Sequence, residues 1–292
     1  MTQRLNGLIR KLESGAVATL SFCPPTIESA IAFSTSQYDG VMIECEHQPW
    51  DPLSLRDAFQ YLLNRRLIAA SGSIAPSVTP IVRIPANGAE HSQWLAKQAL
   101  DLGAYGIVWP HISTVEQAYA AVAACRYPTL ESHPLHRPFG QRGDGPTGAV
   151  RYWGLTQQEY YRKADAWPLN RDGEILVMLM IEDVEGIGNL RDILREVRGI
   201  GAVMIGEGDL SQELGIPRQY EHPELLDAMA KIRSVCGEFD VPVAHPHVTK
   251  ENAERVFDEG YRLLVCGPSR TYPALEKVRQ LADAQGAAPQ RN

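Results

Sequence analysis

The chain has 292 residues, of which 44% are hydrophobic and 22% are charged, and its formal net charge is −7 at pH 7. This composition is typical of a globular protein with enough apolar material for a large core. The negative charge argues against nucleic acid or an anionic membrane as the main partner, but it permits a small anionic substrate. No apolar stretch approaches the length of a membrane-spanning helix, and the polar first residues lack the core of a signal peptide.

The first half of the chain predicts strands that alternate with helices. The expected strands are residues 16–22, 39–44, 80–84 and 105–109, because each is a short apolar run bounded by turn-forming or charged residues. The expected helices are residues 4–14, 26–34, 53–64 and 90–102, and a further helix capped by Ser113 or Thr114 runs to Ala124. Residues 65–79 are predicted to be an apolar link rich in turns.

The regular pattern is interrupted by a long excursion at residues 127–171, which is rich in proline, glycine and charge. One short helix is expected within it, near residues 157–164. A long excursion inside a regular repeat is more often a functional lid or a contact surface than a linker.

The alternation of strands and helices resumes after the excursion. Strands are expected at residues 175–181, 202–205, 241–244 and 261–266, and helices at 189–197, 223–239, 250–259 and 274–284. This makes eight strands in all, and their alternation with helices predicts an α/β fold, a (β/α)8 TIM barrel forming a single domain over residues 1–292. The alternative is an open doubly wound sheet, but no glycine-rich dinucleotide fingerprint follows the first strand.

The cysteines bear on the redox environment of the protein. There are five, an odd number, and they are scattered without a Cys-x-x-Cys pair: Cys23, Cys45, Cys125, Cys236 and Cys266. Such a pattern favours reduced thiols in a cytoplasmic protein over a disulfide framework.

Titratable side chains gather where the predicted strands end. In a (β/α)8 barrel the reactive groups lie at the carboxyl ends of the strands. The side chains expected at this rim are Glu44, Glu46, His47, Arg83, Trp109, His111, Glu182, Asp209, His245 and His247, followed by Gly267, Pro268 and Ser269. This concentration at one edge indicates an active site.

Two of these acids form a candidate metal site. Glu182 and Asp209 each follow an apolar run, and they are 27 residues apart, about one strand–helix–strand repeat. Carboxylates at the same end of neighbouring parallel strands can converge on one cation, and hard divalent ions prefer oxygen ligands. The alternative is that these acids stabilise the amino-terminal ends of the helices that follow.

Four further rim residues have both a chemical and a structural interpretation. His47 is a candidate general base, because a carboxylate such as Glu44 can fix the imidazole tautomer, although it could also be an ordinary surface histidine. Arg83 lies in an apolar strand, where it would face a carboxylate or an enolate, or else form a structural ion pair. His245 and His247 point the same way at strand spacing and suggest another metal site, which Pro246 between them disfavours.

Several segments, taken together, resemble the metal-dependent pyruvate aldolases. They are residues 41–49 (VMIECEHQP), 81–85 (IVRIP), 103–111 (GAYGIVWPH), 181–182 (IE) and 205–215 (IGEGDLSQELG). This family includes 4-hydroxy-2-oxoheptanedioate aldolase and 2-keto-3-deoxy-sugar-acid aldolases, and the resemblance extends over about residues 5–283. It implies a (β/α)8 barrel in a homohexamer built as a trimer of dimers, with the last helix exchanged between subunits.

The resemblance also implies roles for individual residues. Glu182 and Asp209 would hold Mg²⁺ or Mn²⁺, with Co²⁺ as a further option. His47 would be the base, acting through a metal-bound water and oriented by Glu44. The remaining expected roles are ordering of the metal waters by Glu46, binding of pyruvate and its enolate by Arg83, and binding of the pyruvate carboxylate by the backbone around Gly206, Gly208 and Asp209.

The chemistry expected from this set is that of a class II aldolase, a carbon–carbon lyase. Cleavage of a 4-hydroxy-2-oxoacid gives an aldehyde and a pyruvate enolate, whose charge a divalent cation and an arginine can stabilise. The rim positions hold no lysine that could form a Schiff base. The alternatives are oxaloacetate decarboxylation with capture of the enolate, as in macrophomate synthase, and a barrel that binds ligands without turnover.

Three positions depart from the usual pattern of the family. Glu44 stands where aspartate is common, Met180 where glutamine is common, and Glu207-Gly208 where Pro-Ala is common. A thioether cannot donate the hydrogen bond of an amide, and Glu207 adds negative charge near the predicted metal site. Because of these departures, the resemblance does not determine which substrate the chain takes or which reaction of the family it catalyses.

Overall fold

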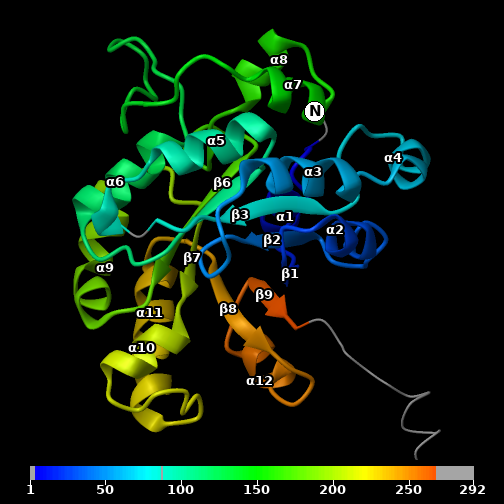
Figure 1. Cartoon of the computed structure of the whole chain (residues 1–292). Coiled ribbons are helices and arrows are strands. Elements are labelled where there is room, and N and C mark those ends of the chain that lie inside the picture. The colour runs from blue at the N-terminus through cyan, green and yellow to red at the C-terminus, as the bar shows by residue number, and fades with distance from the viewer. Residues whose placement is uncertain (1–3, 87, 268–292) are drawn as a thin grey trace, which may run out of the picture.

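A closed barrel of parallel strands forms the centre of the protein in the computed structural model, which describes residues 4–86 and 88–267. The barrel strands are β1 (Ala18–Cys23), β2 (Gly40–Glu44), β3 (Thr79–Arg83), β4 (Gly106–Trp109), β6 (Ile175–Ile181), β7 (Ala202–Ile205), β8 (Val243–Val248) and β9 (Leu263–Cys266). They follow the order β4-β3-β2-β1-β9-β8-β7-β6, and pairing of β4 with β6 closes the ring (Figure 1). The predicted (β/α)8 barrel is confirmed, and the alternative of an open sheet is wrong.

The barrel strands are apolar because both of their faces are covered. All seven residues of β6 (ILVMLMI) are buried, as expected for a parallel strand between the barrel interior and the surrounding helices. The interior holds its own cluster of side chains, to which alternate strand positions contribute, among them Leu20, Met42, Ile81, Met178 and Met204. The other face of the strands packs against the helices in the larger cluster.

Most helices cover the outside of the barrel. They are α2 (Ile27–Phe33), α3 (Pro52–Leu62), α5 (Trp94–Leu102), α6 (Val115–Ala124), α9 (Val184–Glu196), α11 (Pro223–Glu238) and α12 (Ala253–Asp258), with the 3₁₀ turn η1 (Gly88–Glu90) before α5. Two further helices differ from these: α4 (Arg65–Ser71) buries none of its residues, and α10 (Glu207–Glu213) lies at the carboxyl-terminal rim after β7. α4 and α10 were not predicted, because they are short helices without a sustained apolar stripe. The predicted start of α9 was also too late, because Asp183 caps this helix by accepting the N–H of Gly186 at 2.5 Å.

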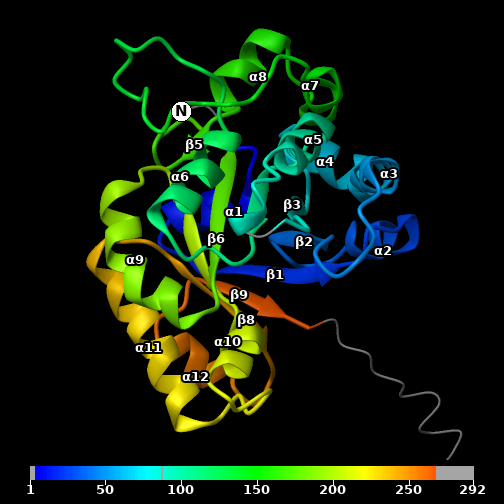
Figure 2. The ribbon, with the colours of Figure 1, turned by 60° about the vertical axis from the view of Figure 1, so that its left-hand side comes forward.

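The long excursion contains more structure than was predicted. The expected helix near 157–164 is confirmed as α8 (Gln157–Lys163), but α7 (Thr147–Trp153) and the short strand β5 (Ala166–Trp167) were not foreseen. β5 pairs with the start of β6, and the indole of Trp153 donates to Gly103 O at 2.9 Å. These contacts lie at the amino-terminal ends of the strands, opposite the rim at which the carboxylates gather. α7 and α8 accordingly lie far from α10 and α12 in both views (Figure 1 and Figure 2).

The first helix closes the amino-terminal end of the barrel. Leu8 and Ile9 of α1 (Gly7–Glu13) pack into the interior cluster. The helix is held there by the buried carboxylate of Glu174, which accepts the backbone N–H groups of Leu5 at 3.1 Å and Asn6 at 2.9 Å. The amide of Asn6 in turn donates to the carbonyl oxygens of Tyr105 at 2.9 Å and Glu174 at 3.0 Å. A small polar network therefore fixes the closed end.

Three remaining expectations concern the chain as a whole. All five cysteines are free thiols, as predicted. In the part of the chain that the structure describes, no helix is both long enough and apolar enough to cross a membrane. The helix expected at residues 274–284, with its predicted exchange between subunits, lies outside the described residues.

The network at the closed end makes a testable contribution to stability. Glu174→Ala would leave the buried backbone N–H groups of Leu5 and Asn6 without their acceptor and Lys163 without its ion pair, whereas Arg4 would keep its pair with Glu13. We expect the free energy of unfolding to fall by about 3 kcal/mol in urea denaturation, because breaking a buried charged network is costly. The control Glu196→Ala, which removes an exposed pair with Arg195, should change it by less than about 0.5 kcal/mol. Equal losses in the two variants would contradict this account.

Candidate active site at the carboxyl-terminal rim

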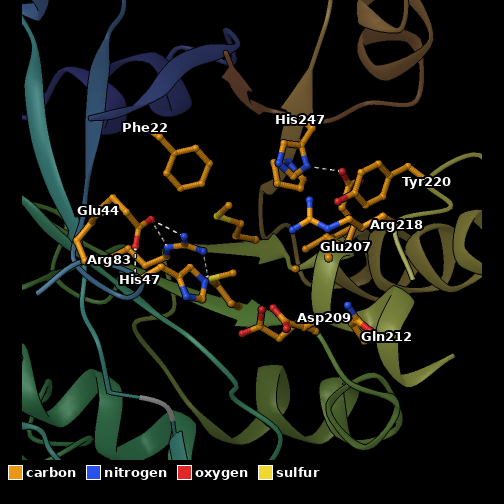
Figure 3. A pocket seen from close by; sticks show the side chains of 18 of the residues that line it. Phe22, Glu44, His47, Arg83, Glu207, Asp209, Gln212, Arg218, Tyr220 and His247 are labelled. Atoms are coloured by element: carbon orange, nitrogen blue, oxygen red, sulfur yellow. Dashed lines mark hydrogen bonds and ion pairs between the residues drawn. The ribbon is translucent and has the colours of Figure 1, made fainter. Parts of the chain in front are cut away.

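A pocket of about 430 Å³ opens at the carboxyl-terminal rim of the barrel (Figure 3). Of the residues predicted to form the site, it is lined by Glu44, His47, Arg83, Glu182, Gly206, Gly208 and Asp209. Glu46 adjoins these residues through an ion pair with Arg83. The strand ends therefore bring the predicted residues together, as the barrel geometry requires.

Arg83 is held between two carboxylates on one side of the pocket. The register of β2 and β3 sets Glu44 beside Arg83, and Nε of the guanidinium donates to Glu44 Oε2 at 2.8 Å. Nη2 contacts the same oxygen, and Nη1 lies 2.9 Å from Glu46 Oε2. The guanidinium also lies 4.9 Å from the centroid of the Phe22 ring. The structural ion pair considered for Arg83 is thus present, and it fixes the guanidinium at the pocket wall.

The surroundings of His47 differ from those predicted. Glu44 Oε1 accepts the backbone N–H groups of Glu46 at 2.8 Å and His47 at 3.0 Å, so the side chain of Glu44 folds back onto the turn that carries the histidine. The carboxylate near the imidazole is instead that of Glu46, whose Oε2 lies 3.7 Å from Nε2. The imidazole side chain is 67% exposed and faces the pocket. Glu44 therefore orients the backbone of His47, and Glu46 lies beside its ring.

A candidate metal site lies at the base of the pocket and includes a residue not predicted as a ligand. Within the described residues, His111, Glu182 and Asp209 form the one cluster of its kind, with one ligand atom from each lying within 4.8 Å of the others. The two acids were predicted as ligands, whereas His111 was predicted only as a rim residue. The signal in the sequence was its place two residues after the end of β4, and the structure adds that its backbone is left-handed there, with a φ of 49°.

The carboxylate of Glu182 is incompletely satisfied. Oε1 accepts the backbone N–H of His111 at 2.5 Å, whereas Oε2 is buried and has no hydrogen-bond partner in the described structure. Burial raises the pKa of Glu182 to about 7, and nearby Glu46 and Asp209 add to this rise while His111 opposes it. A buried oxygen without a donor, close to other carboxylates and an imidazole, fits a hard divalent cation. The side chains of His111, Glu182 and Asp209 therefore suit the divalent metal ion expected from the sequence.

Gly206 is required by the close approach of Glu182. A Cβ atom at this position would overlap Oε2 and Cβ of Glu182. The N–H of Gly206 donates to Ile181 O at 3.1 Å, so it is already used within the fold. The N–H groups that follow Gly206 are therefore better candidates for binding a carboxylate than that of Gly206, and the predicted role of this segment stays a prediction.

The opposite side of the pocket is built around Glu207 and His247. The buried carboxylate of Glu207 contacts His247 Nδ1, and the imidazole of His247 stacks on Tyr220 with centroids 5.6 Å apart. His245 is buried, which lowers its pKa, and its Nδ1 accepts the N–H of His247 at 3.2 Å. Within the described residues the two histidines are not part of a cluster of three possible ligands, so the alternative metal site is not supported, and His247 pairs with Glu207 instead.

Comparison with known proteins identifies the family. The sequence model of the HpcH/HpaI aldolase/citrate lyase family matches residues 23–269 of this chain. The chain belongs to this family. The resemblance to metal-dependent pyruvate aldolases inferred from the sequence is thereby confirmed.

Individual relatives of this HpcH/HpaI chain are named as aldolases. The hydroxypyruvate/pyruvate aldolase of Roseobacter denitrificans is 31% identical over 234 residues, which cover 79% of this chain and 78% of that protein. The 2-keto-3-deoxy-L-rhamnonate aldolase of Salmonella gallinarum is 33% identical over 194 residues, 66% of this chain and 60% of that enzyme. The crystal structure of a family member from Burkholderia cenocepacia superposes with a TM-score of 0.75 at 25% identity, covering 96% of this chain and 99% of that one.

The unsatisfied carboxylate predicts how metal affects stability. Glu182→Gln should raise the melting temperature of the chelated protein, because it removes a buried charge beside Glu46 and Asp209. Mn²⁺ at 100 times its Kd should stabilise the wild type by about 2.7 kcal/mol, and the variant hardly at all. Differential scanning fluorimetry with and without Mn²⁺ measures both effects. The control Glu185→Gln, at an exposed neighbouring position, should keep the response to Mn²⁺. A full response in Glu182→Gln would contradict the site.

Two glycines in the same segment provide a matched pair of variants. Gly206→Ala should displace the Glu182 carboxylate and weaken Mn²⁺ binding by about tenfold or more in isothermal titration, because residues that position a ligand affect affinity to that extent. Gly208→Ala adds the same methyl group where no atom lies within 4 Å, so it should bind Mn²⁺ as the wild type does. Equal affinity in the two variants would show that Glu182 does not need its observed position.

Proposed function

We propose that this chain is a divalent-metal-dependent aldolase that forms or cleaves the C–C bond of a 4-hydroxy-2-oxoacid through a pyruvate enolate. The family of the chain and the names of its relatives support an aldolase. The observation that carries the proposal is the buried Oε2 of Glu182, which has no hydrogen-bond partner among the described residues and belongs to the cluster with His111 and Asp209.

The residues that would hold the metal are Glu182 and Asp209, with His111 as a third candidate. Carboxylate and imidazole donors suit Mg²⁺ or Mn²⁺, and Co²⁺ would also accept this set. When bound, the ion supplies positive charge that stabilises the enolate oxygen of pyruvate. Asp209 occupies the first turn of α10 and Glu182 the end of β6, so two rigid elements set their separation.

Arg83 would bind the 2-oxoacid and stabilise the negative charge of its enolate. Glu44 acts as a positioning residue, because its carboxylate holds Nε and Nη2 of the guanidinium. Nη1, which contacts Glu46, is the donor that a substrate anion would recruit if the Glu46 carboxylate turned aside. The N–H groups that follow Gly206, around Gly208 and Asp209, remain the candidates for binding the pyruvate carboxylate.

His47 would exchange a proton with the C4 hydroxyl group of the substrate. In cleavage it accepts this proton as the C3–C4 bond breaks, and in synthesis it returns the proton to the new alkoxide. Histidine suits this task because it changes charge near neutral pH. Glu46, 3.7 Å from Nε2, would stabilise the imidazolium that forms. The homohexamer and the cytoplasmic location expected from the sequence stay predictions.

The proposal is tested by exchange of the pyruvate methyl protons in D₂O, followed by NMR. We expect exchange that requires Mg²⁺ or Mn²⁺ and stops on chelation, since it reports enolate formation without any choice of aldehyde. Arg83→Ala should slow it by about 10² to 10³-fold, as expected for removal of a donor to a developing oxyanion. His47→Ala should slow aldol cleavage by about 10² to 10⁴-fold.

The controls separate this chemistry from loss of folding. His133 is an exposed histidine of the excursion, so His133→Ala should leave both reactions unchanged. Circular dichroism checks that Arg83→Ala and His47→Ala keep their secondary structure. Absence of exchange by the wild type with metal bound would refute the proposed function.

A further inference from the structure

Arg218 lines the pocket on the side opposite Arg83 (Figure 3). The acidic side chains of the lining are Glu44, Glu182, Glu207 and Asp209, and its arginines are Arg83 and Arg218. Arg83 is neutralised by Glu44 and Glu46. Within residues 4–86 and 88–267, Arg218 has no carboxylate at ion-pair distance. Among the described residues that line the pocket, Arg218 is therefore the arginine without an ion pair.

The backbone of Arg218 is held in a costly conformation. Its φ is +59°, in the left-handed region that residues with a Cβ rarely adopt. Its N–H donates at 2.9 Å to the hydroxyl oxygen of Ser211, which is buried in α10 and itself donates to Gly208 O at 2.6 Å. The segment that carries Arg218 is thus tied to the same short helix that carries Asp209.

This attachment fixes the origin of the Arg218 side chain relative to the candidate metal site. A substrate whose oxoacid end lies at Glu182, Asp209 and Arg83 would extend its other end toward the far wall, where Arg218, Tyr220 and Gln212 line the pocket. The guanidinium group binds carboxylates and phosphates through two parallel N–H donors. A cation at the far wall also favours entry of an anion into a pocket whose lining is otherwise rich in carboxylates.

We propose that Arg218 is a specificity-determining residue that binds an anionic group, a carboxylate or a phosphate, at the end of the aldehyde substrate remote from the reacting carbonyl. This inference rests on the proposed aldolase function and adds the class of its second substrate. The preferred aldehydes are acidic, and neutral aldehydes of the same length react less efficiently.

The experiment measures addition of pyruvate to matched pairs of aldehydes by the metal-loaded enzyme. One pair is 4-oxobutanoate and butanal, and the other is glyceraldehyde 3-phosphate and glyceraldehyde, so the two arms distinguish a carboxylate from a phosphate. For the wild type we expect kcat/KM to be about tenfold or more higher for at least one anionic aldehyde than for its neutral partner. High salt should reduce this preference, because Arg218 is exposed.

Arg218→Gln should remove the preference mainly through KM for the anionic aldehyde and leave kcat/KM for the neutral one unchanged. Arg218→Lys should restore part of it, because lysine keeps the charge without the paired donors. The matched control is Arg191→Gln, which removes an equal charge from an exposed ion pair with Glu238 on the outer helices. It should behave as the wild type.

The inference is overturned if the wild type shows no preference for either anionic aldehyde, or if Arg218→Gln lowers kcat/KM equally for both members of a pair. It is also overturned if Arg218→Gln changes only the oligomeric state in light scattering, because Arg218 then serves a subunit contact. Pyruvate methyl exchange, run on the same preparations, should be equal in the wild type and Arg218→Gln. Absence of exchange in the wild type would instead refute the proposed aldolase function, on which this inference rests.

Discussion

The buried carboxylate of Glu182 is the group on which the arrangement of the rim depends. Glu182 directly follows the apolar strand β6, which places it in the pocket, and its Oε1 accepts the backbone N–H of His111. Gly206 must lack a side chain so that β7 can pass beside it. Oε2 of Glu182 has no hydrogen-bond partner in the described structure, and Glu46 and Asp209 add negative charge nearby. The fold thus maintains an electrostatic cost that a divalent cation would relieve.

The network that stabilises the fold and the candidate active site lie at opposite ends of the barrel. At the amino-terminal end, α1 and the buried pair Asn6 and Glu174 form a network in which the polar groups are matched by donors or acceptors. At the carboxyl-terminal end, the described residues that line the pocket include more carboxylates than arginines, and Arg83 is shared between Glu44 and Glu46. This division is common to (β/α)8 barrels, in which the rim can vary while the closed end preserves the fold.

The sequence predicted the architecture well, because buried parallel strands leave a clear apolar signal. The bounds of β6 and β7 agree with those expected, and Glu182 and Asp209 lie together as the strand–helix repeat required. The sequence could not show side-chain direction. Spacing favoured Glu44 as the partner of the His47 imidazole, whereas the turn directs Glu44 to Arg83 and to backbone N–H groups. His111 was overlooked as a ligand because its position depends on a left-handed backbone after β4.

The most direct test of the account is a crystal structure with Mn²⁺ and oxalate, a dianion that resembles the pyruvate enolate in shape. Anomalous scattering at the manganese edge locates the ion independently of any assumption about ligands. The account predicts a single strong peak between the carboxylates of Glu182 and Asp209, with oxalate bound to the ion and facing Arg83. Manganese at Glu207, His245 and His247, or elsewhere on the surface, with the Glu182 site empty, would contradict it.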